Sequence, residues 1–319
     1  MIQVVALAGG VGGAKLAQGL YAALPPDSLL VLVNTADDFT LHGLRICPDL
    51  DTVLYTLAGL ANPQTGWGIA GDTFATLEML TRYGADDTWF QIGDRDFATH
   101  IQRTQLLAVG MPLSAVEAEL GRALKVRATL LPMADTPVAT LVDTDAGRLS
   151  FQDYFVRRRH SDNVRGIVFD GIAEAAPPES LAPALAKAEA IVFCPSNPLV
   201  SIGPILAVPG LRDLLARAPA PRVAVSPIVG GKALKGPADQ MLATLGHEVS
   251  AYGVAALYQG LIDGIVIDEA DAALAPRIAD LGMRVQVAPT VMRDEADRKA
   301  LAQTVLAFCA GIASERGQG

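Results

Sequence analysis

The sequence predicts an α/β protein with a Rossmann-like, mostly parallel sheet, helices on both faces and a largely helical insertion. Residues 2–8 form an apolar run rich in β-branched side chains, and this run ends directly in the glycine turn 9–13. Apolar residues at helical spacing follow through Leu16 and Leu20, and residues 29–33 form a second candidate for a buried strand. A strand, a glycine turn, a helix and a second strand in this order are typical of a parallel sheet covered by helices.

The rest of the chain extends this pattern within a single domain spanning residues 1–319. Apolar spacing becomes helical from about 50 to 125, and we assign about 50–135 to a helical insertion. Residues 138–142 and 148–156 alternate around a turn signal and predict a hairpin-like pair. Further strands are expected near 166–169, 190–194, 222–226, 264–267 and 284–288, with helices near 179–188, 209–217, 237–246, 253–261 and 294–313.

The composition is that of a soluble globular protein, since 51% of the 319 residues are hydrophobic and 18% are charged. The formal net charge of −9 disfavours nucleic acid as a partner. The longest charge-free stretch, 190–211, contains four prolines, which excludes a continuous membrane helix. The N-terminus has no cationic region ahead of its apolar segment, so we expect a cytoplasmic protein without membrane contact.

The glycine turn is the first candidate binding element, because it lies between a strand end and a helix start, where backbone amides favour phosphate. It is not a Walker A loop, since leucine follows Lys15, and Lys15 also stands where G-x-G-x-x-G needs its third glycine. Tight packing of strand against helix, without a ligand, is the alternative. The candidate phosphate-binding residues are Gly10, Gly12, Gly13 and Lys15.

Acidic and amide side chains follow the second strand. Asn34 ends it, and the carboxylates come from Asp37, Asp38, Asp49 and Asp51. Carboxylates near strand ends can hold Mg²⁺ against a diphosphate. The alternative is that about half of them cap helices or form turns. We expect Asp37, Asp38 and Asp51 to be the metal ligands.

Three further segments carry polar groups suited to a substrate. Residues 93–96 and the helix that follows include Arg95, which can clamp an anion. The loop 194–198 offers Ser196 and Asn197, which either contact a base or ribose or form a structural turn. The segment 226–237 is a second glycine-lysine loop after a strand, and its candidate contacts are Ser226, Gly230, Gly231, Lys232 and Lys235.

These segments together resemble a known family, the 2-phospho-L-lactate transferases, called CofD in archaea and FbiA in mycobacteria. The resemblance runs in order across most of the chain. It rests on GGVGGAKLAQGL (9–20), NTADDFTLHGLRICPDLDT (34–52), GDRDFATHIQRT (93–104), FQDYFVR (151–157), PSNPLVSIGPILAVPG (195–210) and SPIVGGKALKGP (226–237).

The resemblance implies a Rossmann-like, homodimeric phosphotransferase of coenzyme F420 biosynthesis that depends on Mg²⁺. The terminal ribityl hydroxyl of the deazaflavin Fo would attack the phosphorus that carries a three-carbon acid in a guanosine diphosphate adduct, and GMP would leave. Asp49 and Arg95 occupy the motifs whose aspartate and basic residue contact Fo in the family. The diphosphate would lie on the turn from Gly10 to Lys15, with Lys232 or Lys235.

Two other classes of protein fit part of the sequence. A nucleotide-sugar-binding regulator of the YvcK type resembles the chain in its glycine loop and its Ala-Asp-Asp motif (36–38). A nicotinamide dehydrogenase is suggested by the first strand and glycine turn alone, but Asn34 stands where an acidic residue belongs. The sequence leaves the acid open among phospholactyl, phosphoenolpyruvyl and phosphoglyceryl groups.

Overall fold

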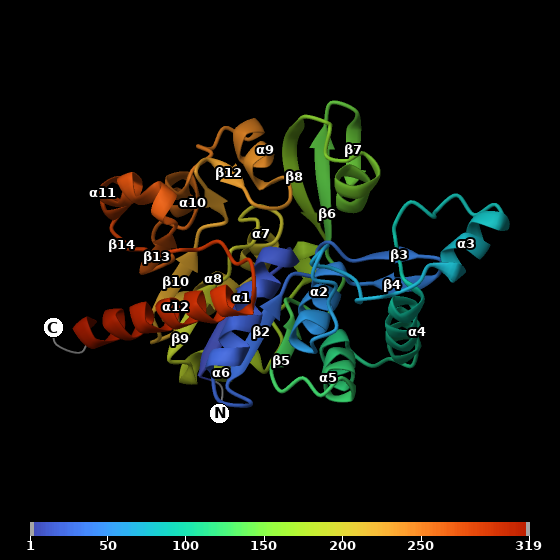
Figure 1. The fold of residues 1–319 in the computed structure, drawn as a ribbon, viewed down its shortest axis with the longest axis horizontal. Coiled ribbons are helices and arrows are strands. Elements are labelled where there is room, and N and C mark those ends of the chain that lie inside the picture. The colour runs from blue at the N-terminus through green and yellow to red at the C-terminus, as the bar shows by residue number, and fades with distance from the viewer. Residues whose placement is uncertain (1–2, 317–319) are drawn as a thin grey trace.

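The computed structural model describes residues 3–316, and its centre is a seven-stranded sheet in the order β14-β13-β10-β9-β1-β2-β5 (Figure 1). All neighbouring strands in this sheet run parallel. The predicted Rossmann-like α/β fold is therefore confirmed. The strands are β1 (Val4–Ala8), β2 (Leu29–Val33), β5 (Thr129–Pro132), β9 (Ala190–Phe193), β10 (Arg222–Val225), β13 (Gly264–Ile267) and β14 (Arg284–Val287).

The central strands are apolar at every position because the sheet is buried on both faces. All five residues of β1 and all five of β2 are buried, and Val4 to Ala8 pair in register with Leu29 to Val33. Such strands appear as continuous apolar runs rather than as an alternation. The shared register brings the residues that follow Ala8 and Val33 to the same edge of the sheet.

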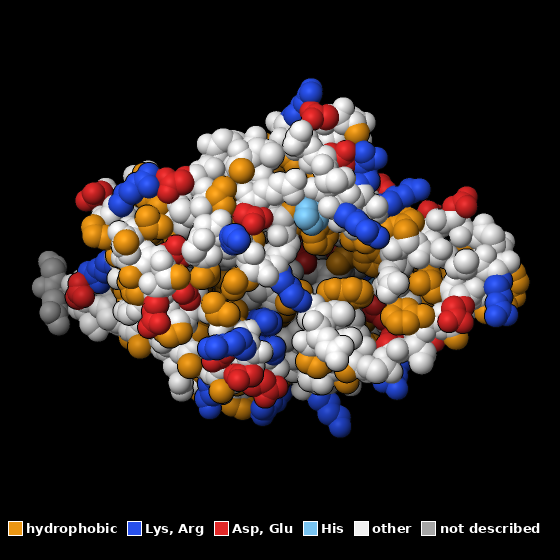
Figure 2. All heavy atoms as spheres, turned by 45° about the horizontal axis from the view of Figure 1, so that its top comes forward, with side chains coloured by type: hydrophobic (Ala, Val, Ile, Leu, Met, Phe, Trp, Pro, Cys, Tyr) orange, Lys and Arg blue, Asp and Glu red, His pale blue; other side chains and the backbone are white. Residues whose placement is uncertain are grey.

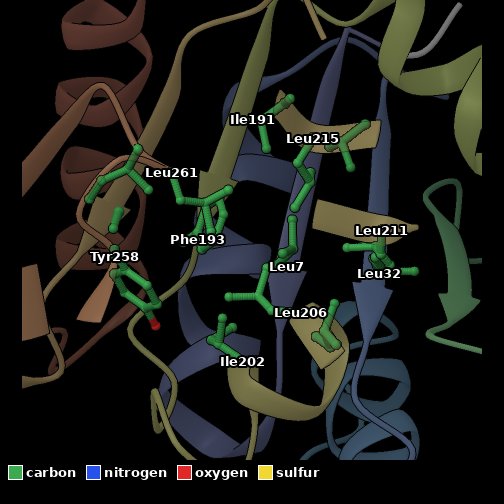
Figure 3. Close-up of a cluster of buried hydrophobic side chains, with 14 of the residues drawn as sticks. Leu7, Leu32, Ile191, Phe193, Ile202, Leu206, Leu211, Leu215, Tyr258 and Leu261 are labelled. Atoms are coloured by element: carbon green, nitrogen blue, oxygen red, sulfur yellow. The ribbon is translucent and has the colours of Figure 1, made fainter. Parts of the chain in front are cut away.

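Helices cover each face of the sheet. On one face α1 (Gly10–Ala23), α2 (Pro48–Leu57) and α12 (Glu295–Arg316) pack against alternate strand residues such as Ala6 and Val31. On the other face Leu7, Ile191 and Phe193 point toward helix side chains, as Figure 3 shows. That layer is made by α6 (Leu181–Lys187), α7 (Ile202–Ala207), α8 (Leu211–Arg217) and α10 (Ala251–Leu257).

Smaller elements surround the carboxyl edge of the sheet. The β3–β4 hairpin and α3 extend away from the β2 and β5 side of the sheet, and a small antiparallel sheet in the order β7-β6-β8 stands at the top of the view, next to α9 (Figure 1). Their bounds are β3 (Phe39–Leu41), β4 (Leu44–Ile46), α3 (Ala75–Arg82), α4 (Asp94–Ala108), α5 (Leu113–Ala123), β6 (Ala139–Thr144), β7 (Gly147–Ser150), the π-turn η1 (Asp153–Arg157) and β8 (Val164–Asp170). The remaining elements are η2 (Ile172–Glu174), β11 (Ile228–Val229), β12 (Lys232–Ala233), α9 (Ala238–Thr244), η3 (Glu269–Leu274) and α11 (Ala275–Ala279).

Three details differ from the expectations. Residues 129–132, placed in the helical insertion, form β5 at the edge of the central sheet. The strand expected near 166–169 exists as β8, but it pairs antiparallel with β6 outside the central sheet, where one face meets solvent. The expected strand 148–156 ends at Ser150, because the chain then turns into η1. None of the helices within residues 3–316 combines the length and apolar character needed to cross a bilayer.

The core packing predicts a large effect of truncating Phe193. This side chain is fully buried, and its ring centroid lies 5.4 Å from that of Tyr258. Phe193→Ala should lower the free energy of unfolding by about 3–5 kcal/mol, because a cavity remains between sheet and helices. Urea unfolding measures the effect. Val109→Ala, at a side chain that is 79% exposed, is the control and should change stability by under about 0.5 kcal/mol; equal effects would contradict the described core.

Candidate active site

The site lies where the strand order of the central sheet reverses, between β1 and β9. Chain connections diverge at such a point, and the crevice outside the carboxyl ends of the strands is the usual ligand site of an open parallel sheet. Here the loops after the two strands meet, because the Gly9 amide donates a hydrogen bond to Ser196 Oγ at 3.0 Å. Figure 2 shows a hollow near the middle of this side of the molecule, with hydrophobic and acidic side chains in it and basic side chains on its rim.

The glycines of the turn are required by close contacts. A Cβ on Gly12 would collide with the carbonyl oxygen of Pro195, and a Cβ on Gly13 would collide with Ser196 Oγ. The tight-packing alternative therefore accounts for these two glycines. It does not account for Gly10, whose amide donates to a carboxylate, Asp49 Oδ1, at 2.7 Å. This amide is one of the donors that the start of a helix leaves without an intrahelical partner.

Asp49 connects three elements at this edge. It lies in the first turn of α2, its Oδ1 accepts from Gly10 of α1, and its Oδ2 accepts from Asn34 Nδ2 at 2.9 Å, directly after β2. Burial raises the pKa of Asp49 to about 6, although the hydrogen bonds from Asn34 and Gly10 oppose this rise. The carboxylate is therefore mostly ionised at neutral pH and close to the range in which it can exchange protons.

Asp37 and Asp38 are buried in the loop that follows β2. Burial raises the pKa of Asp37 well above its ordinary value, and the nearby charge of Asp49 raises it further. Burial also raises the pKa of Asp38 to about 7, against the effect of Arg45, whose Nη2 lies 3.1 Å from Asp38 Oδ2. The Oδ1 atoms of both aspartates are buried without a hydrogen-bond partner among the described residues. Orphaned buried oxygens together with mutual repulsion are properties that a divalent cation would relieve.

Asp51 is placed differently from the other carboxylates. Both of its oxygens accept from the guanidinium of Arg103, with Nη1 at 3.1 Å from Oδ2. Arg103 is fully buried in α4 and also donates from Nε to Glu117 Oε1 at 2.9 Å, in α5. Asp51, Asp96 and His100 lie close enough together to share a cation, but the Arg103 charge already neutralises Asp51. The pairing of Arg103 with Asp51 was not expected from the sequence, in which 52 residues separate them.

Arg95 lies at the exposed start of α4. Its backbone amide donates to Asp72 Oδ1 at 2.9 Å, and its Nη1 lies 3.5 Å from the carbonyl oxygen of Ala70. No described carboxylate forms an ion pair with its guanidinium, which keeps the charge available to an anionic or hydroxylated ligand.

The polar residues of two other loops are engaged within those loops. Asn197 Oδ1 accepts from the amides of Leu199 at 2.9 Å and Val200 at 3.4 Å, so it stabilises the turn before α7. Ser226 Oγ donates to the carbonyl oxygen of Ile228 at 2.9 Å and accepts from the amide of that residue. The contacts of Asn197 therefore support the alternative that this residue forms a structural turn.

The second glycine-lysine loop forms a hairpin. Gly230 and Gly231, with φ of 57° and 76°, make the two-residue turn between β11 and β12, which positive φ at both positions favours. Lys232 is exposed on β12. Lys235 reaches across to donate to the carbonyl oxygen of Thr65, so this loop meets the α2–α3 connection.

That contact brings Lys235 toward the glycine turn. Gly66, next to the bonded Thr65, packs against Val11 so closely that a Cβ on this glycine would collide with the valine side chain. Lys15 donates from Nζ to the carbonyl oxygen of Met292 at 2.8 Å. Burial lowers the pKa of Lys15, and the charges of Arg298 and Lys235 lower it further. Two of the three predicted lysines, Lys15 and Lys235, thus approach the turn, and Arg298 reaches α1 at Gln18.

Comparison with known proteins assigns the chain to a family. The family model described as 2-phospho-L-lactate transferase CofD matches residues 4–307. The chain belongs to the CofD family. The resemblance of the motifs is confirmed, and the chain is a transferase by that membership.

CofD relatives cover almost the full chain. The phosphoenolpyruvate transferase of Streptomyces griseus is 44% identical over 310 residues, which cover 96% of this chain and 98% of that protein. The 2-phospho-L-lactate transferase of Methanosarcina mazei is 39% identical over 303 residues, covering 95% and 99%. A crystal structure of a UPF0052 family member from Bacillus halodurans has a TM-score of 0.63 at 15% identity, covering 96% of this chain and 98% of that one, which shows a shared fold.

In this CofD chain the buried arginine should be essential for stability. Arg103→Met leaves Asp51 and Glu117 buried without their partner, so the free energy of unfolding should fall by about 3–5 kcal/mol. Chemical denaturation measures it. Arg122→Met removes a solvent-exposed pair with Glu119 and should cost under about 1 kcal/mol. A loss at Arg103 no larger than that control would contradict the described network.

Stability should also respond to pH and magnesium together. The pKa values of Asp49 and Asp38, about 6 and about 7, are raised in the folded state, which therefore binds more protons than the unfolded state between the ordinary aspartate value and about pH 7. The contribution of these groups to stability falls as pH rises through that window. A cation that binds their ionised forms offsets the loss. Mg²⁺ should raise the melting temperature more at about pH 8 than at about pH 5.

Asp37→Asn tests the same site, because it removes one of the carboxylates that repel each other. Its melting temperature without Mg²⁺ at about pH 8 should exceed that of the parent protein, and its response to Mg²⁺ should be smaller. An Mg²⁺ response that is equal at both pH values in the parent protein would count against a cation site at these aspartates.

Proposed function

We propose that the protein transfers a phosphorylated three-carbon acid from a guanosine diphosphate adduct to the terminal ribityl hydroxyl of the deazaflavin Fo, releasing GMP, in coenzyme F420 biosynthesis. Membership of the CofD family supports the reaction class. The observation that carries the proposal is the contact between the Asp49 carboxylate and the Gly10 amide, because it places a proton acceptor directly beside a phosphate-binding turn.

The reaction breaks one phosphorus–oxygen bond and forms another. The ribityl oxygen attacks the phosphorus that bears the acid, the bond from that phosphorus to the bridging oxygen of GMP breaks, and the hydroxyl proton is lost. Such transfers depend mainly on aligning the attacking and leaving oxygens and on stabilising charge on the phosphoryl oxygens. The protein therefore has to hold a hydroxyl and a diphosphate in line at the carboxyl edge of the sheet.

Asp49 suits the hydroxyl side of this reaction. Its two oxygens are fixed by donors from Gly10 and Asn34, so the carboxylate has one orientation. With a pKa near 6 it is ionised at neutral pH and can orient the ribityl hydroxyl and accept its proton. The guanidinium of Arg95 is exposed and forms no ion pair with a described carboxylate. In the proposal it contacts another part of the Fo molecule.

The glycine turn suits the diphosphate side. Amides at the start of α1 and the ammonium of Lys15 lie together at the end of β1, and Lys235 approaches from the opposite loop. Ser196 lies directly against this turn. Lys232 is exposed on the neighbouring hairpin, and we include it as a further contact to the diphosphate.

The carboxylates fit the Mg²⁺ that the family resemblance implies. Asp37 and Asp38 each offer a buried oxygen that lacks a partner among the described residues, whereas Asp51 would have to share its oxygens with Arg103. Asp37 and Asp38 are thus the first candidates to hold the ion. Bound there, Mg²⁺ would supply positive charge to the diphosphate oxygens.

Three finer assignments complete the proposal. The relatives at 43–45% identity from Streptomyces, Kitasatospora and Thermobifida species are named phosphoenolpyruvate transferases, so a phosphoenolpyruvyl donor is the first to test. We place the reaction in the cytoplasm and the protein in a homodimer. These assignments rest on the relatives and on the family resemblance.

A competition assay tests the activity. The protein is mixed with Fo, Mg²⁺ and guanosine diphosphate adducts of phospholactate, phosphoenolpyruvate and phosphoglycerate, and products are identified by mass spectrometry. A new Fo phosphodiester with release of GMP supports the proposal, and its mass names the acid. No product from folded protein with any donor, together with tighter binding of a UDP-sugar than of GDP, would favour the nucleotide-sugar-binding regulator.

Asp49→Asn tests the assignment of the base. The amide keeps the size of the side chain but has lost most of its basicity, so kcat should fall by about 10²-fold or more. Its nitrogen cannot accept from Gly10 or Asn34, so the melting temperature should also fall, and circular dichroism checks that the variant is folded at the assay temperature. Steady-state kinetics at saturating Fo measure the change. Asp213→Asn, exposed on α8 and outside the family motifs, is a matched control and should keep kcat within about twofold of the parent. Unchanged kcat in Asp49→Asn would remove this residue from the chemistry.

A further inference from the structure

Three basic side chains from distant parts of the chain converge beside the glycine turn. Lys15 belongs to α1, Lys235 lies between β12 and α9, and Arg298 lies in α12. Arg298 Nη1 donates to Gln18 Oε1, one helical turn along α1 from Lys15, and Lys235 Nζ lies 3.3 Å from the place of a Cβ on Gly66, which packs against the turn at Val11. The charges of Arg298 and Lys235 also lower the pKa of Lys15. Arg298 has no place in the motifs that define the family resemblance, and the sequence gives no separate signal for it.

These cations are not neutralised by the protein. Their hydrogen-bond acceptors are neutral: Lys15 donates to the Met292 carbonyl oxygen, Lys235 to the Thr65 carbonyl oxygen, and Arg298 to Gln18 Oε1. Within residues 3–316 none of the three forms an ion pair with a carboxylate.

The absence of a counter-ion is informative because acidic residues outnumber basic ones, 34 to 25. Arginines elsewhere in the chain commonly form an ion pair with a carboxylate, as Arg222 does with Asp263 and Arg158 does with Asp162. Bringing three like charges together opposes folding unless an anion offsets the repulsion. The cluster therefore points to a ligand with more than one negative charge.

The packing of α12 fixes Arg298 in this position. The backbone carbonyl of Arg298 lies so close to Gly19 of α1 that a Cβ on the glycine would collide with it. The arginine is half-buried, and its Nε is buried without a hydrogen-bond partner among the described residues. A guanidinium with an unused donor, next to an ammonium at the start of a helix, suits the oxygens of a phosphate group.

We propose that Arg298, together with Lys15 and Lys235, binds the diphosphate of the nucleotide donor and selects a diphosphate over a monophosphate. The inference rests on the proposed function for the identity of the donor, and it adds a residue to the site. Two adjacent phosphates present charged oxygens to all three cations together, whereas one phosphate on the glycine turn would leave part of the cluster without a partner.

Nucleotide binding tests this assignment without turnover. Calorimetry compares the affinities for GDP and GMP, in buffer with EDTA, of the parent protein, Arg298→Gln and Arg298→Lys. Arg298→Gln should weaken GDP binding by at least about tenfold and GMP binding by clearly less, since a charge-assisted contact to the second phosphate is lost. Arg298→Lys, which keeps the charge, should recover part of the affinity for GDP. Inorganic pyrophosphate should compete with GDP in the parent protein and more weakly in Arg298→Gln.

Arg293→Gln is the matched control. Arg293 lies five residues earlier, is largely exposed and pairs with Asp297, so its loss should leave both affinities within about twofold of the parent. A second readout is the pKa of Lys15, measured by NMR of labelled lysine side chains. It should rise in Arg298→Gln because a neighbouring positive charge has been removed, and a purely structural role of Arg298 would not produce this change.

The outcomes separate this inference from the proposed function. If Arg298→Gln binds GDP as tightly as the parent while Lys15→Gln does not, Arg298 is outside the site, and transfer to Fo by the parent would still stand. If Arg298→Gln loses GDP affinity but the parent transfers no acid to Fo, the diphosphate site stands and the proposed transfer fails. Equal weakening of GDP and GMP in Arg298→Gln would overturn the selection of the diphosphate.

Discussion

The buried carboxylate of Asp49 is the constraint on which the arrangement of the site depends. It accepts one hydrogen bond from the Gly10 amide at the start of α1 and another from the Asn34 side chain at the end of β2. Because Asp49 itself lies in the first turn of α2, three elements are fixed relative to one another by two contacts. The same contacts hold the carboxylate beside the glycine turn, where the proposed diphosphate would bind.

Acidic and basic groups form separate clusters. Asp37 and Asp38 are buried, and each has an oxygen that has no described partner. The cation cluster of Lys15, Lys235 and Arg298 has only neutral described acceptors. The proposed diphosphate and divalent cation would be complementary to both groups, and a local site of this kind can overcome the mean field of a protein with a net charge of −9.

The sequence predicted the parts of this arrangement that depend on local patterns. Continuous apolar runs identified β1 and β2, and the glycine turn identified the junction between β1 and α1, because a fully buried parallel strand and a tight turn each leave a local signal. The sequence did not predict β5 (Thr129–Pro132), because a strand of four residues next to helical segments is too short to show a periodic pattern of its own. The pairing of Arg103 with Asp51 and the approach of Arg298 to Lys15 depend on tertiary packing between distant segments, so no local pattern reveals them.

A crystal structure of the protein with GDP, Mg²⁺ and Fo is the decisive measurement. We expect the terminal ribityl oxygen within hydrogen-bonding distance of Asp49, and the diphosphate on the turn from Gly10 to Lys15, in contact with Arg298. A diphosphate bound away from the carboxyl ends of β1 and β9, or a ribityl chain directed away from Asp49, would contradict this expectation.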